Sequence, residues 1–140
     1  MLGKITKELI RLSEKAAKKG EIPVSCIIVL NGKIIAKAYN QREKRNSVLA
    51  HAEILAIQKA TKKLKTWHLN DCEMYVSLEP CEMCKKIKAE SKIRNVYYLV
   101  YSLNTTNNMK INYSRIDEKD VKAKYKKILQ KSFEKIRMTK

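Results

Sequence analysis

Hydrophobic residues near the start of the chain follow the spacing of one helical face. Between residues 5 and 16 apolar positions recur every three or four residues, and Gly20 follows where a helix C-cap belongs. Pro80 directly precedes a further predicted helix over residues 81–91, a position in which proline is tolerated. Apolar residues at helical spacing return at residues 50–64, with good helix formers between them, and at residues 117–137. The sequence predicts a helix over each, and the last should pack Tyr125 and Phe133 on its apolar face.

Short and nearly continuous apolar runs lie between these helices. The run from Val24 to Leu30 is followed by Asn31-Gly32, a strong hairpin signal, and residues 33–39 return as a second strand. Further strands are predicted at residues 73–78 and 95–101, with a short one near 110–113. The polar and basic residues 40–48 are interpreted as a loop.

The order of these elements defines a fold class. Strands that alternate with helices are typical of an α/β protein with a layered sheet. The chain has 140 residues, enough for one sizeable core, and shows no internal repeat or linker. We therefore expect a single domain over residues 1–140.

Four residues at the starts of two predicted helices carry the chemistry. His51 and Glu53 open the helix 50–64, while Cys81 and Cys84 open the helix 81–91. One imidazole and two thiolates suit zinc, and three protein ligands leave a tetrahedral zinc one open, catalytic position. Cysteines three apart on a helix share a face, and the amides of the helix N-terminus favour their thiolate forms.

The spacing of His51 and Glu53 restricts where a metal can lie. Positions two apart on a helix face different sides, so both can reach a zinc ion only if it lies over the end of the helix. We expect His51 to come from across the sheet to meet the cysteines. Zinc would lower the pKa of its water to about 7, and Glu53 would pass the proton to a leaving amine. This chemistry is hydrolytic deamination of an amino-substituted aromatic ring.

A closed structural zinc site and a pair of disulfides are the alternatives. A fourth ligand would have to be Cys26, Cys72 or His68. Cys72 begins the strand that leads to Cys81, and six strand residues span about 20 Å, so Cys72 and His68 should be out of reach. Cys26 remains open as a fourth ligand. A Cys-x-x-Cys pair with a partner ligand favours metal over disulfides.

The charge of the chain bears on its partner. Lysine and arginine number 31 against 14 acidic residues, a net charge of +17, which favours a nucleic acid. Only six of the basic residues are arginine, and a lysine-rich composition or a solvated surface would also explain the excess. No apolar run approaches the roughly 18 residues of a membrane span, and the charged N-terminus lacks a secretion signal. We expect a cytoplasmic protein with no membrane partner.

The motifs together resemble one family. His-x-Glu followed by Pro-Cys-x-x-Cys is the signature of zinc nucleobase deaminases, and the chain resembles the bacterial tRNA-specific adenosine deaminases of the cytidine deaminase superfamily. The residues that carry the resemblance are Gly20-Glu21-Ile22-Pro23-Val24, Asn40, Ala50-His51-Ala52-Glu53-Ile54, Trp67-His68-Leu69, the run from Tyr75 to Cys84, Ser91-Lys92-Ile93 and the terminal helix with Phe133.

The resemblance implies a fold, a reaction and a set of roles. It implies a cytidine deaminase-like three-layer α/β/α fold with a five-stranded mixed sheet, one zinc ion per chain and a homodimer. It implies conversion of adenosine to inosine at the wobble position of a tRNA anticodon arm. By motif match, the zinc ligands are His51, Cys81 and Cys84, the proton shuttle is Glu53, Asn40 contacts the flipped nucleoside, and Pro23, Val24, Ala52 and Leu78 form the pocket.

The chain departs from the family pattern in four places. Ser25-Cys26 stands where Gly-Ala is usual, and residues 46–49 replace a common Asp-Pro-Thr. Lys85-Lys86 replaces small residues, and the loop after Tyr101 lacks the usual Asp, Lys and glycines. These departures concern the substrate more than the chemistry.

Two other functions are consistent with the same motifs. A deaminase of a free base or nucleotide, of the guanine, cytosine or dCMP type, would share the zinc motif without needing so basic a surface. A non-catalytic zinc or RNA-binding protein would have no use for Glu53, so the intact acid argues against that class.

Overall fold

The computed structural model describes residues 2–78, 80–100, 112–116 and 119–138. Its elements, in chain order, are α1 (Leu2–Lys18), β1 (Ser25–Leu30), β2 (Lys33–Tyr39), α2 (Arg42–Arg45), α3 (Ala52–Leu64), β3 (Cys72–Leu78), α4 (Glu82–Glu90), β4 (Asn95–Val100), β5 (Asn112–Arg115) and α5 (Lys119–Met138). Among these helices, none is long and apolar enough to cross a membrane.

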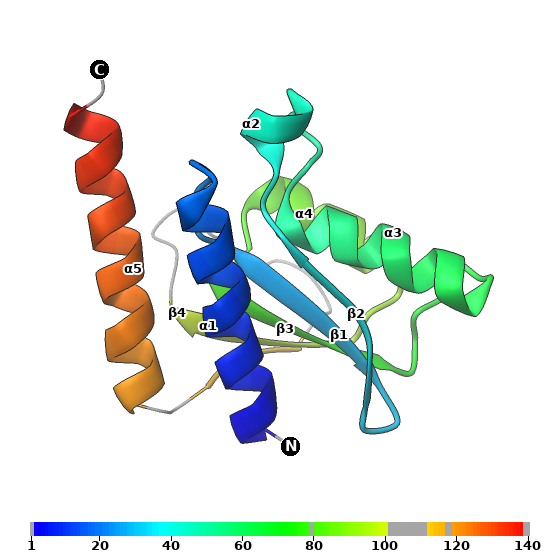
Figure 1. Ribbon diagram of the computed structural model, residues 1–140. Helices are drawn as coiled ribbons and strands as arrows, with labels where there is room; N and C mark the ends of the chain where they lie inside the picture. Colours follow the sequence, from blue (N-terminus) through cyan, green and yellow to red (C-terminus); the bar gives the residue numbers. More distant parts are fainter. Residues whose placement is uncertain (1, 79, 101–111, 117–118, 139–140) are drawn as a thin grey trace.

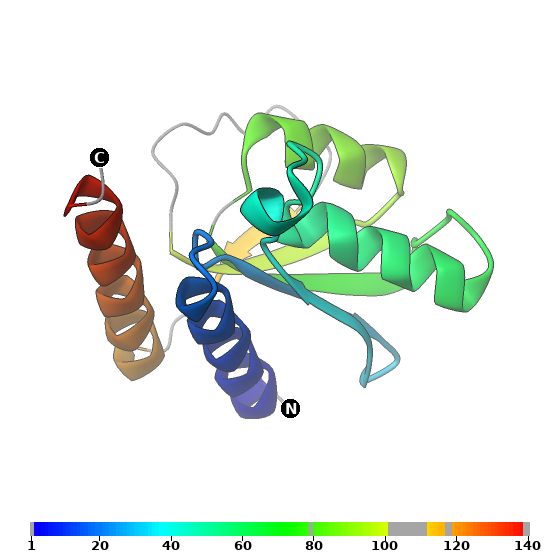
Figure 2. The same ribbon diagram turned by 45° about the horizontal axis from the view of Figure 1, so that its top comes forward.

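A mixed sheet forms the middle of the molecule. Its strand order is β2-β1-β3-β4-β5, with β1 antiparallel to β2 and β3, and β4 parallel to β3 and β5. Helices α3 and α4 cover one face of this sheet, and α1 and α5 cover the other (Figures 1 and 2). The α/β fold with helices on both faces is the one that the sequence predicts.

The interior strand β1, which lies between β2 and β3, contributes to both cores because its side chains alternate. Cys26 and Ile28 point into the core beneath α3 and α4, whereas Ile27 and Val29 point into the core beneath α1 and α5. All four side chains are at most 2% exposed. A strand covered on both faces needs apolar residues at nearly every position, which explains the continuous run in the sequence.

Most predicted elements lie within a few residues of their expected bounds, and two expectations are wrong. The segment read as a loop contains the short helix α2, four residues without an apolar position that could signal it. Phe133 is 45% exposed rather than packed on the core, whereas Tyr125 is fully buried. Tyr101, the loop after it and the expected start of the last helix at residues 117–118 lie outside the described residues.

A buried chain of hydrogen bonds ties α5 to the sheet. The Ser25 main-chain N–H donates to the Ser77 hydroxyl (3.0 Å), which donates to the Tyr125 hydroxyl (3.0 Å). Tyr125 in turn donates to the main-chain carbonyl of Pro23 (2.8 Å), and the Ser25 hydroxyl donates to the carbonyl of Leu9 (2.7 Å). The hydroxyl of Ser25, one of the departures from the family pattern, therefore links β1 to α1.

Removing the Tyr125 hydroxyl should destabilise the fold. The Tyr125→Phe variant leaves the Pro23 carbonyl and the Ser77 hydroxyl buried without this partner, which costs about 1–3 kcal/mol. Urea unfolding measures the loss. Tyr75→Phe is the matched control, because the Tyr75 hydroxyl reaches Glu73 only at 3.5 Å. Equal losses of unfolding free energy in the two variants would contradict this account.

An ion cluster joins α1 to β2 at the surface. The Glu8 carboxylate accepts hydrogen bonds from Arg11 and from Lys37, the latter at 2.8 Å between Nζ and Oε2. These two cations, Arg11 foremost, hold the pKa of Glu8 at about 2. The folded state therefore stabilises the ionised form of Glu8 relative to its neutral form.

This lowered pKa predicts a pH-dependent contribution to stability. Since the pKa of Glu8 rises to about 4.5 on unfolding, the stabilisation is complete above that pH and disappears as the pH falls through about 2. Glu8→Gln should cost only about 0.5–1 kcal/mol at neutral pH, because water screens a surface pair. Unfolding curves recorded from neutral to acid pH should converge for the two proteins. A difference that stays constant with pH would argue against the pairing.

Candidate metal centre and pocket

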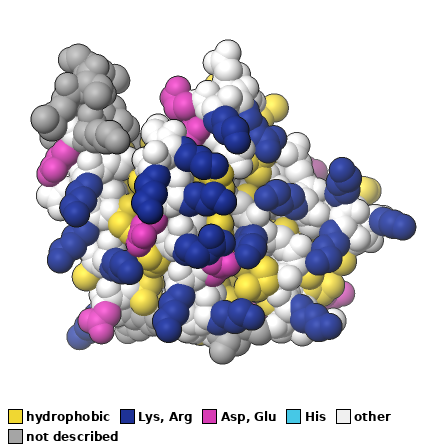
Figure 3. Space-filling view, in the orientation of Figure 1, with side chains coloured by type: hydrophobic (Ala, Val, Ile, Leu, Met, Phe, Trp, Pro, Cys, Tyr) yellow, Lys and Arg dark blue, Asp and Glu magenta, His cyan; other side chains and the backbone are white. Residues whose placement is uncertain are grey.

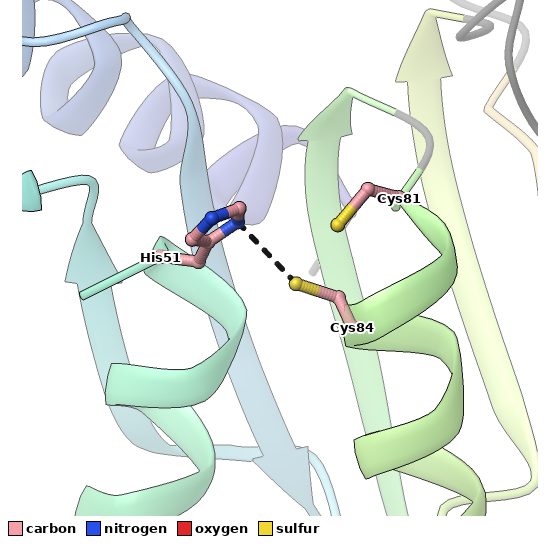
Figure 4. A group of neighbouring side chains, drawn as sticks. All are labelled: His51, Cys81 and Cys84. Atoms are coloured by element: carbon pink, nitrogen blue, oxygen red, sulfur yellow. Dashed lines mark hydrogen bonds between the residues drawn. The ribbon is translucent and has the colours of Figure 1, made fainter. Parts of the chain in front are cut away.

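Three side chains with metal-binding atoms meet where two helices begin. His51 is the N-cap residue of α3 and Cys81 the N-cap residue of α4, both with extended backbone, and Cys84 lies in the first turn of α4. Their ligand atoms all lie within 4.8 Å of one another, and Nδ1 of His51 is 3.5 Å from Sγ of Cys84. Figure 4 shows the imidazole and the Cys84 thiol pointing toward each other, with Cys81 beside them.

The packing of α3 against α4 brings these residues together. The two helices contact each other on the same face of the sheet, with their N-termini at the same end (Figure 4). The expectation that His51 comes from across the sheet is therefore wrong. The restriction to the helix end is correct, because His51 caps α3 and does not lie on its flank.

Main-chain hydrogen bonds fix the approach to His51. The N–H of Gln41 donates to the carbonyl of Ala50 (2.9 Å), so the segment containing α2 leaves the sheet and returns to nearly the same place. This closure sets His51 beside the end of β2. On the other side of the site, Pro80 directly precedes Cys81, a position in which proline does not disturb the helix that follows.

Hydrogen bonds among the three groups shift their pKa values in opposite directions. Hydrogen bonding with Cys84, and next with His51, lowers the pKa of Cys81 to about 3. The same contact with Cys81, together with burial, raises the pKa of Cys84. The pKa of His51 is raised, chiefly by its hydrogen bond to Cys81. Cys81 is therefore a thiolate at neutral pH, the form that binds zinc.

The donor group has three members in the part of the chain that the structure describes. Among the described residues, the cluster of His, Cys, Asp and Glu atoms consists of His51, Cys81 and Cys84. Cys26 is fully buried in the core beneath α3 and α4, where burial raises the pKa of its thiol. Cys72 starts β3 and is likewise a core residue. Within the described part of the chain, the donor set has the three members of an open zinc site.

A pocket of about 160 Å³ opens at this cluster. Glu53, in the first turn of α3, is only 3% exposed and lines the pocket together with two of the three donors. The buried carboxylate thus faces the same space as the donor atoms. The residues that line the pocket are Ile22, Val24, Asn40, Arg42, His51, Ala52, Glu53, Leu78 and Cys81.

The residues expected to bind substrate fall into two groups. Val24, Asn40, Ala52 and Leu78 line the pocket, and Asn40 is 6% exposed with its Oδ1 accepting the N–H of Arg42 (3.2 Å). With that oxygen engaged, the amide of Asn40 has its two N–H donors left for a ligand. Pro23 is buried behind the pocket, and its carbonyl holds the Tyr125 hydroxyl; it is outside the lining found among the described residues.

Three residues near the pocket have no site role assigned to them from the sequence. Ile22 and Arg42 line it directly. Glu21 is 2% exposed, and its carboxylate accepts the main-chain N–H groups of Glu43 (2.9 Å) and Lys44 (2.8 Å), which holds α2 against the pocket rim. The available signals were an acid directly before the Ile-Pro-Val segment and an arginine two positions after Asn40.

The fold and this site together define a class of protein. Residues 3–100 match the family described as the cytidine and deoxycytidylate deaminase zinc-binding region. The match covers more than half of the chain, which therefore belongs to this family. The resemblance predicted from the sequence is confirmed at that level.

Individual relatives are more specific than the family. The chain is 45% identical over 92 residues to a tRNA-specific adenosine deaminase of Bacillus subtilis, a match covering 66% of this chain and 57% of that protein. It is 46% identical over 92 residues to the tRNA-specific adenosine deaminase of Aquifex aeolicus, covering 66% and 61% of the two proteins. The match thus spans less than two thirds of these relatives.

Solved structures with the same fold include two kinds of deaminase. One, from work on A-to-I editing by tRNA:A34 deaminases at the wobble position of tRNA, superposes with a TM-score of 0.75 at 26% identity, covering 83% of this chain and all of that one. A guanine deaminase from Bacillus subtilis superposes with a TM-score of 0.65 at 36% identity, covering 69% and 62% of the two chains.

Zinc fits the donor set. Ligand atoms around a tetrahedral zinc ion are about 3.3–3.8 Å apart, given bonds of roughly 2.0–2.3 Å, and the 3.5 Å between Nδ1 of His51 and Sγ of Cys84 lies in this range. A family defined by a zinc-binding region and a cluster of one histidine and two cysteines agree on the metal. The predicted cofactor is confirmed by these two findings.

Proposed function

We propose that this protein is a zinc-dependent deaminase that converts adenosine to inosine at the wobble position of a tRNA anticodon. The observation that carries the proposal is the position of Glu53, a buried acid that lines the same pocket as the three-donor cluster. A structural zinc site has no need of a pocket or of an acid inside it. The names of the relatives support adenosine in tRNA as the substrate.

The proposed mechanism assigns one task to each group. His51, Cys81 and Cys84 would hold the zinc ion, which would supply a water molecule that is nucleophilic near neutral pH. Glu53 would accept a proton from the attacking water and deliver it to the departing amine, so one acid would serve as base and then as acid. Its burial keeps bulk water from competing for the transferred proton.

The remaining pocket residues orient the base. The amide N–H groups of Asn40 donate to acceptor atoms of the nucleoside, and the apolar side chains of Val24, Ala52 and Leu78 contact the faces and edges of the ring. An enzyme of this kind extrudes the target nucleotide from its strand and encloses the base. Pro23, next to the lining residue Val24, is held in place because its carbonyl accepts a hydrogen bond from the Tyr125 hydroxyl.

Positive charge around the pocket supports an RNA substrate. Arg42 lines the pocket and is exposed to solvent, where its guanidinium can pair with a phosphate next to the extruded nucleotide. Lysine and arginine are spread over the face of the molecule seen in Figure 3, with few acidic side chains among them. A net charge of +17 suits a polyanion better than a free base.

Deamination of free guanine is the second candidate, because the guanine deaminase has the higher sequence identity of the two solved structures compared. Incubation with total tRNA, followed by mapping of inosine, separates the candidates. We expect inosine at the first anticodon position and no ammonia from free bases. Turnover of guanine or cytosine with unmodified tRNA would replace the tRNA proposal by the free-base one.

Salt dependence provides a second measurement of the same proposal. If phosphate contacts hold the RNA, its affinity should fall about ten-fold or more between roughly 50 and 200 mM salt. The binding of a free nucleoside should hardly change over this range. RNA affinity that is independent of salt would contradict the role given to the basic surface.

The proposed enzyme is a cytoplasmic homodimer. Val48 and Leu49 are 67% and 56% exposed just before His51, and burying them against a second copy would remove apolar surface from water beside the pocket. Sedimentation equilibrium tests this, with Leu49→Lys expected to favour the monomer. A wild-type protein that is monomeric at high concentration would refute it.

A further inference from the structure

Helix α4 buries charged side chains behind the metal centre. Lys88 has no exposed surface and is among the largest fully buried side chains, whereas Lys86 in the same helix is exposed. Lysine is almost never fully buried unless a compensating charge is near, because taking an ammonium group out of water is expensive. The position of Lys88 therefore needs an explanation.

The helical period places Lys88 next to the metal donors. It follows Cys84 by four positions in α4, so the two side chains lie on the same face of the helix. Two other residues of α4, Ile87 and Ala89, pack against the core that contains Cys26. Lys88 is thus fully inside the protein, and it is outside the pocket lining formed by the described residues.

The charges around Lys88 are negative ones of the site. Burial lowers the pKa of Lys88, and the carboxylate of Glu53 and the thiol groups of Cys26, Cys84 and Cys81 act in the opposite direction. Lys88 in turn stabilises the thiolate forms of Cys26 and Cys84. Glu53 and Lys88, both buried, are therefore electrostatically coupled to each other and to Cys84, the buried member of the donor cluster.

Without Lys88, the charges of the zinc ion, its ligands and Glu53 would not sum to zero. Two thiolates balance the two positive charges of a zinc ion, and His51 is neutral when it binds a metal. The carboxylate of Glu53 then leaves one uncompensated negative charge in a buried site. We propose that the buried ammonium group of Lys88 is the charge-balancing residue of the metal centre, holding the zinc dithiolate and the Glu53 carboxylate together at neutral net charge. The proposal rests on the assigned zinc ligands and goes beyond the proposed reaction, because it requires no particular substrate.

The test compares Lys88→Met with Lys86→Met, which removes an exposed lysine from the same helix. Zinc affinity is measured by competition with a chromophoric chelator at neutral pH. We expect about a ten-fold loss for Lys88→Met, the scale on which outer residues affect metal affinity, and none for Lys86→Met. The absorption bands of the Co²⁺-loaded protein should match those of the wild type, because the ligands are unchanged.

Two further measurements separate charge balance from packing. In the metal-free protein, Lys88→Met leaves the buried Glu53 carboxylate without its compensating cation, so this variant should unfold at a lower temperature. Adding Glu53→Gln removes the negative charge as well, so the double variant should recover most of the lost zinc affinity and of the lost unfolding temperature. A packing role predicts no recovery of either quantity in the double variant, and that outcome would overturn the proposal.

The same zinc measurements test the role of Lys88 separately from the assignment of His51, Cys81 and Cys84 as zinc ligands. Wild-type protein that binds no zinc would overturn both the ligand assignment and the role of Lys88. Wild-type protein that binds zinc, with Lys88→Met equal to Lys86→Met in affinity, would overturn only the role of Lys88.

Discussion

Glu53→Gln should lower the rate of deamination by about 10²–10⁴-fold, the usual contribution of a positioned general acid and base. Glutamine keeps the size of the side chain and cannot accept or deliver the proton. Because Glu53 lies outside the three-donor cluster, the variant should remain folded and should still hold one zinc ion per chain at saturating metal. Single-turnover assays on an anticodon-arm RNA measure the rate, and metal analysis measures the zinc.

Glu82→Gln is the matched control for this prediction. Glu82 is an exposed acid in the first turn of α4, between the two cysteines, so it has a comparable distance along the chain from the donors. Its replacement should change the rate by no more than about two-fold. Glu53→Gln protein with wild-type turnover would mean that another group moves the proton.

Cys84→Ala should abolish both zinc binding and turnover. Removing one of three protein ligands leaves His51 and Cys81, and two donors do not complete either a structural or a catalytic zinc site. The wild type should gain stability when zinc is added, by about 2.7 kcal/mol at a free zinc concentration 100 times the dissociation constant. The melting temperature of the variant should not respond to zinc.

Cys26→Ala provides the control, since Cys26 is a buried thiol outside the donor cluster. It should keep one zinc ion and full responsiveness of its melting temperature to zinc, with a loss of stability of about 1 kcal/mol from the altered core. A Cys26→Ala protein that loses zinc together with Cys84→Ala would show that Cys26 is a fourth ligand and that the site is closed.

Features of the site that depend on local spacing could be read from the sequence. The Cys81-x-x-Cys84 pair and the His51-x-Glu53 pair each sit at the start of a helix, and helix starts have recognisable signals. The continuous apolar run of β4 likewise predicts a strand covered on both faces, and its residues do contribute to both cores. Short-range periodicity is enough for such conclusions because it depends only on neighbouring residues.

Features that depend on distant segments could not be read in this way. The hydrogen bonds from α2 to the Glu21 carboxylate join residues more than 20 positions apart, and α2 contains no apolar residue. The placement of α3 and α4 on one face follows from the packing of the sheet and not from any local pattern. The burial of Lys88 is hidden for the same reason, since a lysine in a helix is normally expected at the surface.

X-ray absorption at the zinc edge, on the loaded wild-type protein, tests the incomplete donor set most directly. Two sulfur donors and about two nitrogen or oxygen donors per zinc ion are expected, since the chain supplies His51, Cys81 and Cys84. Three or more sulfur donors, in a spectrum that does not change when an inhibitor fills the pocket, would mean that the polypeptide closes the site and that the deaminase account is wrong.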